Sequence, residues 1–274
     1  MGGCIYCSAR GSGDFAEGRG LSVTEQYRVT REKLSSKWST ERCIPYFQAH
    51  TNTYAPTLRL RELFEEALAL PGAVGLNIAT RADCLEEDTV SYLAELAERT
   101  TLTVELGLQS TNDDTARKIN RGHTYAEFVE GYRKLRMASD KINICVHLIF
   151  GLPEEDDETM LRSVREVASL HPDQVKLHLL HVLRSSRLGI LYEQGQYHPM
   201  ERDHYIDMIV NALTLLPPDT VVARLTGDGM GSDLLAPDWS RKKVSVINDI
   251  DKRLYDLDLW QGKFFESHKT EDII

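Results

Sequence analysis

Short apolar runs alternate with longer amphipathic segments along this chain, and few folds accommodate such a pattern. The runs are rich in β-branched residues and recur about every 30–45 residues, with a segment of helical periodicity between each pair. A helix that connects two successive strands makes those strands parallel. Several such units in succession favour a barrel, or part of one, over a doubly wound sheet. The expected fold class is therefore α/β.

The same pattern sets the expected bounds of the elements. Strands are expected at residues 43–48, 74–79, 102–108, 142–150, 175–182 and 220–225. Helices are expected at residues 23–38, 58–70, 86–99, 112–119, 125–137, 157–170, 201–216 and 245–257. We assign residues 1–225 to the barrel core and residues 226–274 to a C-terminal extension packed on the barrel.

Charge and composition argue against several classes of protein. The formal net charge is −10, from 32 Lys and Arg against 42 Asp and Glu, so attraction of the whole molecule to nucleic acid or to an anionic membrane is not expected. No apolar run approaches the ~18 residues of a membrane span, and no signal segment opens the chain. Five cysteines, an odd number, do not make a disulfide framework. We expect a cytoplasmic protein.

Polar side chains lie where the expected strands end, which is where parallel α/β folds carry their reactive groups. Glu105 and Gln109 are four residues apart, so both point to the same face of one strand. Gly107 lies between them and leaves that face open to a ligand. Because a carboxylate in an apolar strand needs a partner, Glu105 is expected to meet either a ligand or a basic side chain of the barrel.

Two cysteines three positions apart, Cys4 and Cys7, follow a glycine turn and enclose the aromatic Tyr6. Such a pair can be half of a zinc site, a redox pair or half of an iron–sulfur site. A redox pair should open a helix, but a glycine- and serine-rich loop follows here. A zinc site needs two more cysteine or histidine ligands, and the histidines are scattered over loops and strands. A lone pair of this kind is a weak signal, so the residues by themselves leave the kind of site open.

Taken together, these residues resemble the radical SAM superfamily, and within it a YhcC-like group of bacterial proteins. The chain is more distantly similar to the oxygen-independent coproporphyrinogen oxidases and to the catalytic subunit of Elongator. The resemblance covers almost the whole chain. Its most specific parts are residues 2–7, 46–54, 105–110, 120–123 and 148–154.

This resemblance implies a partial (β/α)6 barrel of TIM type whose first strand is missing here. It also implies a [4Fe–4S] cluster and S-adenosylmethionine as cofactors. Reductive cleavage of S-adenosylmethionine would give a 5′-deoxyadenosyl radical that abstracts a hydrogen atom from a substrate. The implied partners are that unidentified substrate and an electron donor such as flavodoxin or ferredoxin. No catalytic residue beyond the cofactor contacts is assigned.

The resemblance also assigns roles to individual residues. Cys4 and Cys7 match the last two cluster cysteines, and Tyr6 matches an aromatic side chain near the adenine. Gln48 and Asn52 occupy the place of a glycine-rich turn that meets the methionine amino group, although the usual Gly-Gly-Glu is absent. The other residues expected to contact the cofactor are Glu105, Gln109, Arg121, His147, Ile149 and Gly151.

One departure from the family pattern leaves alternatives open. The first cluster cysteine should lie about a dozen residues before Cys4, so we expect an N-terminally shortened chain whose third ligand lay upstream of Met1. One alternative is a non-catalytic barrel that keeps only a nucleoside site. Another is an RNA-modifying radical SAM enzyme. His178 and His181 are interpreted either as cofactor or substrate contacts or as packed histidines.

Overall fold

The computed structural model describes residues 3–8, 11, 20–39, 41–227 and 232–266 of the chain. The chain divides into two compact units. Unit 1 comprises Met1–Ala9, Leu108–Tyr125 and Val146–Ile274, and unit 2 comprises Arg10–Gly107 and Ala126–Cys145. Among the described residues, no helix has the length and the apolar character needed to cross a membrane.

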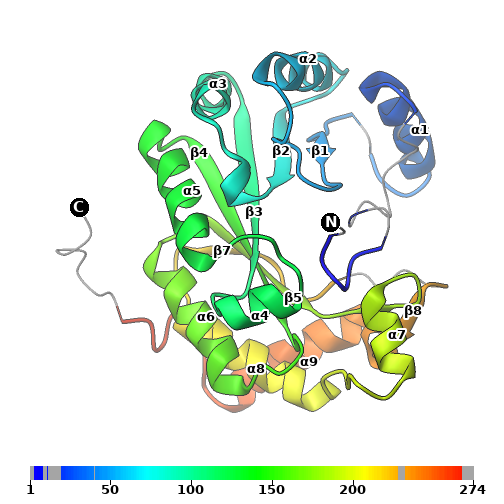
Figure 1. The fold of residues 1–274 in the computed structure, drawn as a ribbon, viewed down its shortest axis with the longest axis vertical. Coiled ribbons are helices and arrows are strands. Elements are labelled where there is room, and N and C mark those ends of the chain that lie inside the picture. The colour runs from blue at the N-terminus through cyan, green and yellow to red at the C-terminus, as the bar shows by residue number, and fades with distance from the viewer. Residues whose placement is uncertain (1–2, 9–10, 12–19, 40, 228–231, 267–274) are drawn as a thin grey trace. The chain divides into compact units, whose positions relative to one another are not determined.

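Six strands form one sheet in the order β1-β2-β3-β4-β5-β7 (Figure 1). Parallel pairing joins β1 to β2, β2 to β3 and β5 to β7. The expected α/β fold with sequential parallel strands is therefore confirmed. The strands are β1 Tyr46–Phe47, β2 Gly75–Thr80, β3 Thr101–Gln109, β4 Ile142–Phe150, β5 Gln174–Leu179 and β7 Val221–Arg224.

The first of these strands is shorter than the six residues expected. Only Tyr46 and Phe47 pair with β2, and Cys43 forms a separate parallel bridge with Ala73. Pro45 lies between the two paired segments and has no backbone N–H to donate to a ladder. Its carbonyl still accepts a hydrogen bond from the Asn77 amide at 2.9 Å. The proline thus interrupts the strand without separating it from β2.

The helices follow the expected order, with one addition. A short helix, α7, was not expected; it begins after Ser186, whose hydroxyl accepts a hydrogen bond from the Gly189 amide. A capping box formed by Ser22 and Glu25 begins α1. The α-helices are α1 Val23–Ser35, α2 Thr57–Leu68, α3 Glu87–Ala97, α4 Asp113–Lys118, α5 Tyr125–Ala138, α6 Asp157–Ser169, α7 Arg187–Glu193, α8 Arg202–Leu215 and α9 Lys243–Asp256.

In unit 2, aromatic side chains join α2 and α3 to the sheet. The Phe64 ring on α2 meets the Phe47 ring of β1 edge-on, with centroids 4.9 Å apart, and stacks with Tyr92 of α3 at 6.4 Å. Phe64 and Tyr92 are almost completely buried. Burial of such large apolar surfaces is a main source of stability in a unit of this size.

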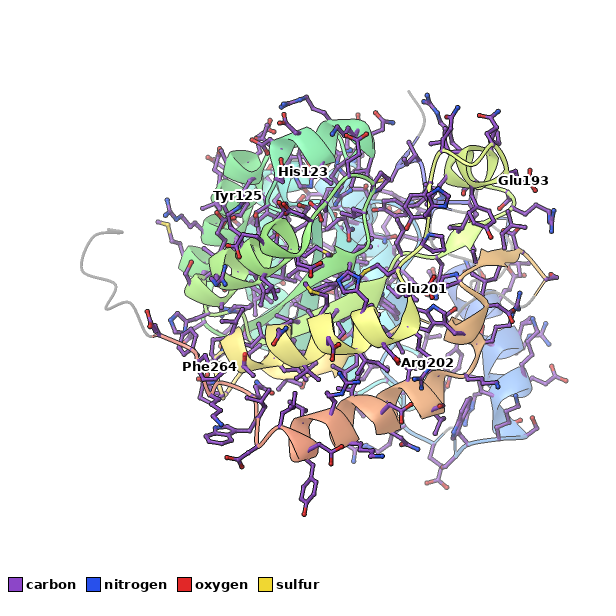
Figure 2. The ribbon with its side chains drawn as sticks, turned by 90° about the horizontal axis from the view of Figure 1, so that it is seen from below. His123, Tyr125, Glu193, Glu201, Arg202 and Phe264 are labelled. Atoms are coloured by element: carbon purple, nitrogen blue, oxygen red, sulfur yellow. The ribbon has the colours of Figure 1, made fainter. Side chains whose placement is uncertain are left out.

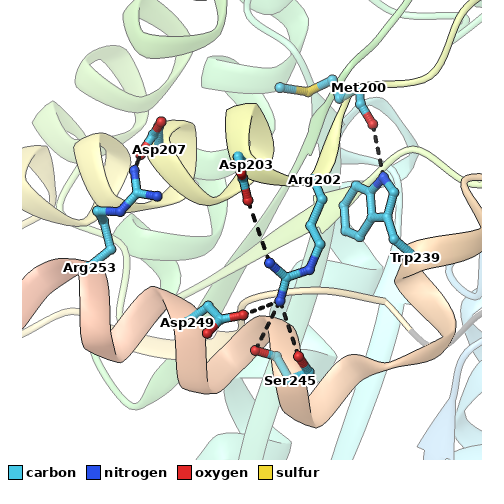
Figure 3. A network of polar contacts seen from close by, with 8 residues as sticks. All are labelled: Met200, Arg202, Asp203, Asp207, Trp239, Ser245, Asp249 and Arg253. Atoms are coloured by element: carbon cyan, nitrogen blue, oxygen red, sulfur yellow. Dashed lines mark hydrogen bonds and ion pairs between the residues drawn. The ribbon is translucent and has the colours of Figure 1, made fainter.

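In unit 1, α8 is buried along most of its surface and contacts both α6 and α9. Figure 2 shows α8 and α9, in yellow and orange, running side by side. Polar contacts join the two helices: Arg202 pairs with Asp249, and Arg253 pairs with Asp207 (Figure 3). The Trp239 indole donates to the Met200 carbonyl at 3.1 Å, which fixes the segment just before α9.

The fifth expected strand, residues 175–182, is divided in the structure. β5 ends at Leu179, and β6, Val182–Leu183, belongs to a separate two-stranded sheet. In that sheet β6 pairs antiparallel with β8, Leu234–Ala236, about fifty residues later in the chain. A continuous apolar run therefore contributes to two different sheets in unit 1.

Gly131 on α5 provides a test of packing within unit 2. A Cβ atom at this position would lie 2.1 Å from the Ala82 carbonyl oxygen, far closer than two such atoms can approach. We predict that Gly131→Ala destabilises the protein by about 2 kcal/mol in urea unfolding, the usual scale for overpacking. The matched control is Gly20→Ala, since a Cβ there meets nothing within 4 Å. Because alanine favours an isolated helix over glycine, equal or higher stability of Gly131→Ala would contradict this packing.

Candidate functional site

The loop that carries the two cysteines is held in unit 1 by its central apolar residue. Ile5 is buried in an apolar cluster that includes Ile119 and Leu188. Its amide donates to the Ile119 carbonyl at 3.0 Å, and its carbonyl accepts from the Leu188 amide at 2.8 Å. The Asn120 side-chain amide donates to the Gly3 carbonyl at 3.0 Å. These contacts leave Cys4 and Cys7 half-buried on either side of the anchor.

The surroundings of Cys4 favour its thiolate form. The pKa of Cys4 is lowered to about 6, first by a hydrogen bond from Cys7 and, against the opposing effect of burial, by the positive charge of Arg121 and a hydrogen bond from Tyr6. Arg121 is itself buried and lies just after α4. Conversely, burial and the neighbouring cysteines raise the pKa of Tyr6 well above its ordinary value, so its phenol stays protonated.

Three residues at or just after strand ends have a left-handed backbone that is uncommon for any residue except glycine. They are His50 after β1, with φ 62°, Gln109 at the end of β3, with φ 78°, and Glu154 after β4, with φ 63°. Such conformations carry a free-energy cost and are concentrated at functional sites. In addition, the Gln109 side-chain oxygen is buried and accepts no hydrogen bond. A buried acceptor without a donor in the protein is open to a hydrogen bond from a water molecule or a ligand.

Ile149 lies at the end of β4, and Gly151 directly follows that strand. Ile149 and Tyr6 both pack against the apolar cluster that buries Ile5. Gly151 has φ 84°, and a Cβ on it would lie 3.0 Å from the Met200 side chain. The Tyr197 hydroxyl donates to the Gly151 carbonyl at 2.7 Å. In unit 1 the fold therefore brings two of the expected adenine contacts to one cluster.

In unit 2, Glu105 has a partner that was not expected from the sequence. The Tyr46 hydroxyl donates to the Glu105 carboxylate at 2.6 Å, and the carboxylate is buried. The Asn52 side-chain amide donates to the carbonyls of Phe47 at 2.9 Å and Ala79 at 2.8 Å. Asn52 thus joins the ends of β1 and β2. Gln48 is half-buried directly after β1.

Among the described residues, no group of three or more His, Cys, Asp or Glu side chains could hold a metal ion. Cys4 and Cys7 are adjacent, whereas Cys43 and Cys84 lie in unit 2 and Cys145 is buried in β4. His147 is on β4 in unit 1, with its ring centroid 5.2 Å from that of His178 on β5. The described part of the chain therefore supplies a pair of adjacent thiols.

Sequence reasoning missed two residues that shape this region. One is Tyr46, the partner of Glu105; it stands in a conspicuous aromatic segment, but it lies 59 positions away in the chain. The other is Tyr197, which is bonded to Gly151 across 46 positions and carries no local signal. Pairings over such distances depend on the fold.

Models of two families match this chain. The radical SAM superfamily matches residues 1–167, and the radical SAM C-terminal domain matches residues 172–256. The protein YtqA of Bacillus subtilis is 44% identical over 273 residues, which are all of this chain and 84% of that protein. The protein YhcC of Escherichia coli is 29% identical over 259 residues, covering 92% of this chain and 80% of that protein.

Two solved structures share the fold. The Elp3 protein of the archaeon Methanocaldococcus infernus, with an N-terminal deletion, matches with a TM-score of 0.73 and 18% identity, covering 88% of this chain and 61% of that one. Methylornithine synthase (PylB) matches with a TM-score of 0.55 and 14% identity, covering 95% of this chain and 79% of that one. These matches support the partial-barrel fold expected from the sequence.

The thiolate of Cys4 leads to a prediction about reactivity. In the metal-free protein, the rate of Cys4 alkylation by iodoacetamide should rise with pH along a titration centred at about 6, because the thiolate is the nucleophile and the Cys4 pKa is lowered to about 6. Mass mapping would separate Cys4 from the other cysteines. In Cys7→Ala the midpoint should move upward, since the largest stabilising hydrogen bond is lost. A midpoint at the ordinary thiol value in the unaltered protein would contradict the arrangement.

Proposed function

The chain belongs to the radical SAM superfamily, and we propose that it binds a [4Fe–4S] cluster and S-adenosylmethionine and abstracts a hydrogen atom from a substrate. The observation that carries this proposal is the cysteine loop of unit 1. There the Cys4 thiolate is stabilised by Cys7 and Arg121, in a segment fixed by backbone hydrogen bonds on both sides of Ile5.

The donor set of this loop fits iron–sulfur ligation. Iron–sulfur clusters are held by deprotonated cysteines, and Cys4 already has a pKa lowered to about 6. The half-buried position of Cys4 and Cys7 beside an apolar cluster limits access of water to both sulfurs. The third thiolate ligand of the cluster would come from a cysteine outside the residues that the structure describes.

When bound, the reduced cluster supplies the electron that cleaves S-adenosylmethionine into methionine and a 5′-deoxyadenosyl radical. The protein residues bind and orient the nucleoside. In unit 1, we assign the adenine to the apolar surface of Tyr6 and Ile149, which pack on one cluster. Gln109 offers its buried side-chain oxygen to an ammonium or hydroxyl donor of the cofactor.

Five further residues are assigned to the proposed cofactor contacts. Arg121, as a buried cation, suits the methionine carboxylate. His147 occupies the position of a ribose contact. In unit 2, the Tyr46 hydroxyl orients the buried Glu105 carboxylate, which we assign as a hydrogen-bond acceptor for the cofactor. Gln48 and Asn52 follow β1 and are assigned to the methionine amino group. The Asn52 side-chain NH2 group donates to two carbonyls. Its side-chain oxygen is assigned as an acceptor for the amino group.

The proposal includes an electron donor and a compartment. A one-electron reductant such as flavodoxin or ferredoxin would reduce the cluster before each turnover. The five cysteines of the described residues form no disulfide, and we assign the protein to a reducing compartment such as the cytoplasm. The substrate remains unassigned at this level. An RNA substrate gains no support from the net charge of −10.

Cluster reconstitution tests the function directly. Anaerobic incubation of the full-length protein with iron and sulfide should give a brown protein with broad visible absorbance, and reduction with S-adenosylmethionine present should give 5′-deoxyadenosine. Cys4→Ala and Cys7→Ala should each abolish both signals, because each removes a thiolate ligand.

The matched controls are Cys43→Ala and Cys84→Ala, half-buried cysteines of unit 2, and both should keep colour and product. A colourless protein that holds zinc would rule out the proposal. Binding of S-adenosylmethionine that survives the double change Cys4→Ala, Cys7→Ala, without any 5′-deoxyadenosine from the unaltered protein, would favour a non-catalytic nucleoside-binding barrel instead.

Gln109 provides a test of cofactor binding. We predict that Gln109→Ala weakens S-adenosylmethionine binding by roughly threefold to tenfold, the effect of one lost hydrogen bond, as measured by calorimetry on the reconstituted protein. The control is Gln196→Ala, an exposed glutamine of the same unit, which should bind as the unaltered protein does. Equal affinity of Gln109→Ala would show that the buried oxygen serves another group.

A further inference from the structure

Five basic side chains of unit 1 gather on neighbouring strands. Their elements are β4, β5, the segment just after β5, and β7, and β5 and β7 pair directly. We call this group the basic cluster; it consists of His147, Lys176, His178, His181 and Arg224.

The pleat of the strands places part of the basic cluster on one face. Along β5, Lys176 and His178 are half-buried, while Leu177 and Leu179 between and after them are buried. Because alternate residues of a strand point to opposite faces, Lys176 and His178 share the less covered face. On β4, His147 is likewise half-buried between two buried neighbours.

The histidines of the basic cluster are close together. The rings of His147 and His178 have centroids 5.2 Å apart. Gly227, in the segment after β7, approaches the other side of the group. A Cβ on Gly227 would lie 3.1 Å from the His181 ring and 4.0 Å from Nδ1 of His178. Gly227 therefore lies close against the His181 ring, and a side chain at this position would press on the histidines.

A nitrogen of the basic cluster lacks a hydrogen-bond partner. Nε2 of His178 is buried and makes no hydrogen bond. Buried imidazole nitrogens are ordinarily bonded to protein or to a ligand. An unbonded nitrogen on the less covered face of β5, among other basic side chains, indicates that a bound group completes its hydrogen bonding.

The charges around His178 indicate the sign of that group. Its pKa is held well below the ordinary value, first by burial and then by four neighbouring groups, which are all basic: His147, Arg224, Lys176 and His181. A cation would be repelled by Lys176 and Arg224, and the described residues contain no group of three side chains that could hold a metal. An anion would be attracted by these basic groups and would offset the repulsion among their positive charges.

We propose that the basic cluster binds an anionic oxygen group of the substrate, a phosphate or a carboxylate. The assignment to the substrate rests on the proposed radical SAM function, whereas the binding of the anion does not. In the complex, His178 donates from Nε2 to an anionic oxygen. Lys176 and Arg224 supply the positive charge that sets the preference for an anion.

Anion binding can be measured on the protein without cluster or S-adenosylmethionine. In protein labelled at histidine, NMR would follow the ring C2–H signals during titration with inorganic phosphate or with acetate. The His178 signal would be assigned by its loss in His178→Gln. Bound anion should raise the titration midpoint of His178 by at least one pH unit, because the charged imidazole gains an opposite charge. The anion that shifts the His178 midpoint at the lower concentration identifies whether the basic cluster prefers a phosphate or a carboxylate. An unchanged midpoint in both titrations would overturn the proposal.

Two variants separate binding at this place from binding elsewhere. Gly227→Ala keeps every charge but places a methyl group 3.1 Å from the His181 ring, which must then shift. It should weaken anion binding at least tenfold, as should His178→Gln. The control is His204→Gln, an exposed histidine of α8 that pairs with Asp157, which should bind the anion normally. Circular dichroism would verify that each variant is folded. Unweakened binding in both Gly227→Ala and His178→Gln would place the anion elsewhere and overturn the proposal.

A further measurement separates this proposal from the proposed function. If S-adenosylmethionine displaces the phosphate or acetate in competition, the basic cluster serves the cofactor carboxylate, and the assignment to the substrate is overturned. Formation of 5′-deoxyadenosine by the reconstituted protein without any anion effect on His178 would contradict this proposal alone. Anion binding without 5′-deoxyadenosine would contradict the radical SAM function and leave the anion site in place.

Discussion

Parallel pairing of the strands is the constraint on which the described structure depends. In a parallel sheet every strand ends at the same edge, and the connecting helices return the chain to the opposite edge. Residues that follow different strands are therefore brought together although they are distant in sequence. In unit 2, Asn52 after β1 bonds to the carbonyl of Ala79 near the end of β2. In unit 1, His147 of β4 meets His178 of β5.

The cysteine loop shows how apolar packing can prepare a reactive group. Ile5 contributes no chemistry, but its burial and its two backbone hydrogen bonds fix the residues on either side. Cys4 then lies close enough to Arg121 for the positive charge to favour its thiolate. Ordering a loop costs backbone conformational entropy. The burial of Ile5 and its hydrogen bonds offset that cost and so hold the neighbouring side chains in place.

Unit 1 also contains polar groups that the protein itself does not satisfy. The side-chain oxygen of Gln109 and Nε2 of His178 are both buried without a hydrogen bond, and Gln109 has in addition an uncommon backbone conformation. Folding alone would select against such costs. In the two proposals made above, a nucleoside near Gln109 and an anion near His178 would supply the missing hydrogen-bond partners.

The sequence by itself determined most of the elements and the family resemblance, and it predicted the chemistry that is proposed. Apolar periodicity located β4 at its observed bounds and located α6 and α9 to within two residues, because periodicity reports which face of a segment is buried. The pair Cys4 and Cys7, together with the motifs at strand ends, carried the resemblance that predicts iron–sulfur ligation, since such short motifs are local properties of the sequence. The expected site residues could be named for the same reason, from short motifs at strand ends.

Only the tertiary structure decided which distant residues meet. The β6–β8 pair, the bond from Tyr46 to Glu105, and the approach of Arg121 to Cys4 each join segments from about fifty to more than one hundred positions apart. A local pattern shows that a residue will be buried, but it does not choose the partner. That choice depends on the simultaneous packing of many segments, and the competing arrangements differ in free energy only when the whole fold is formed.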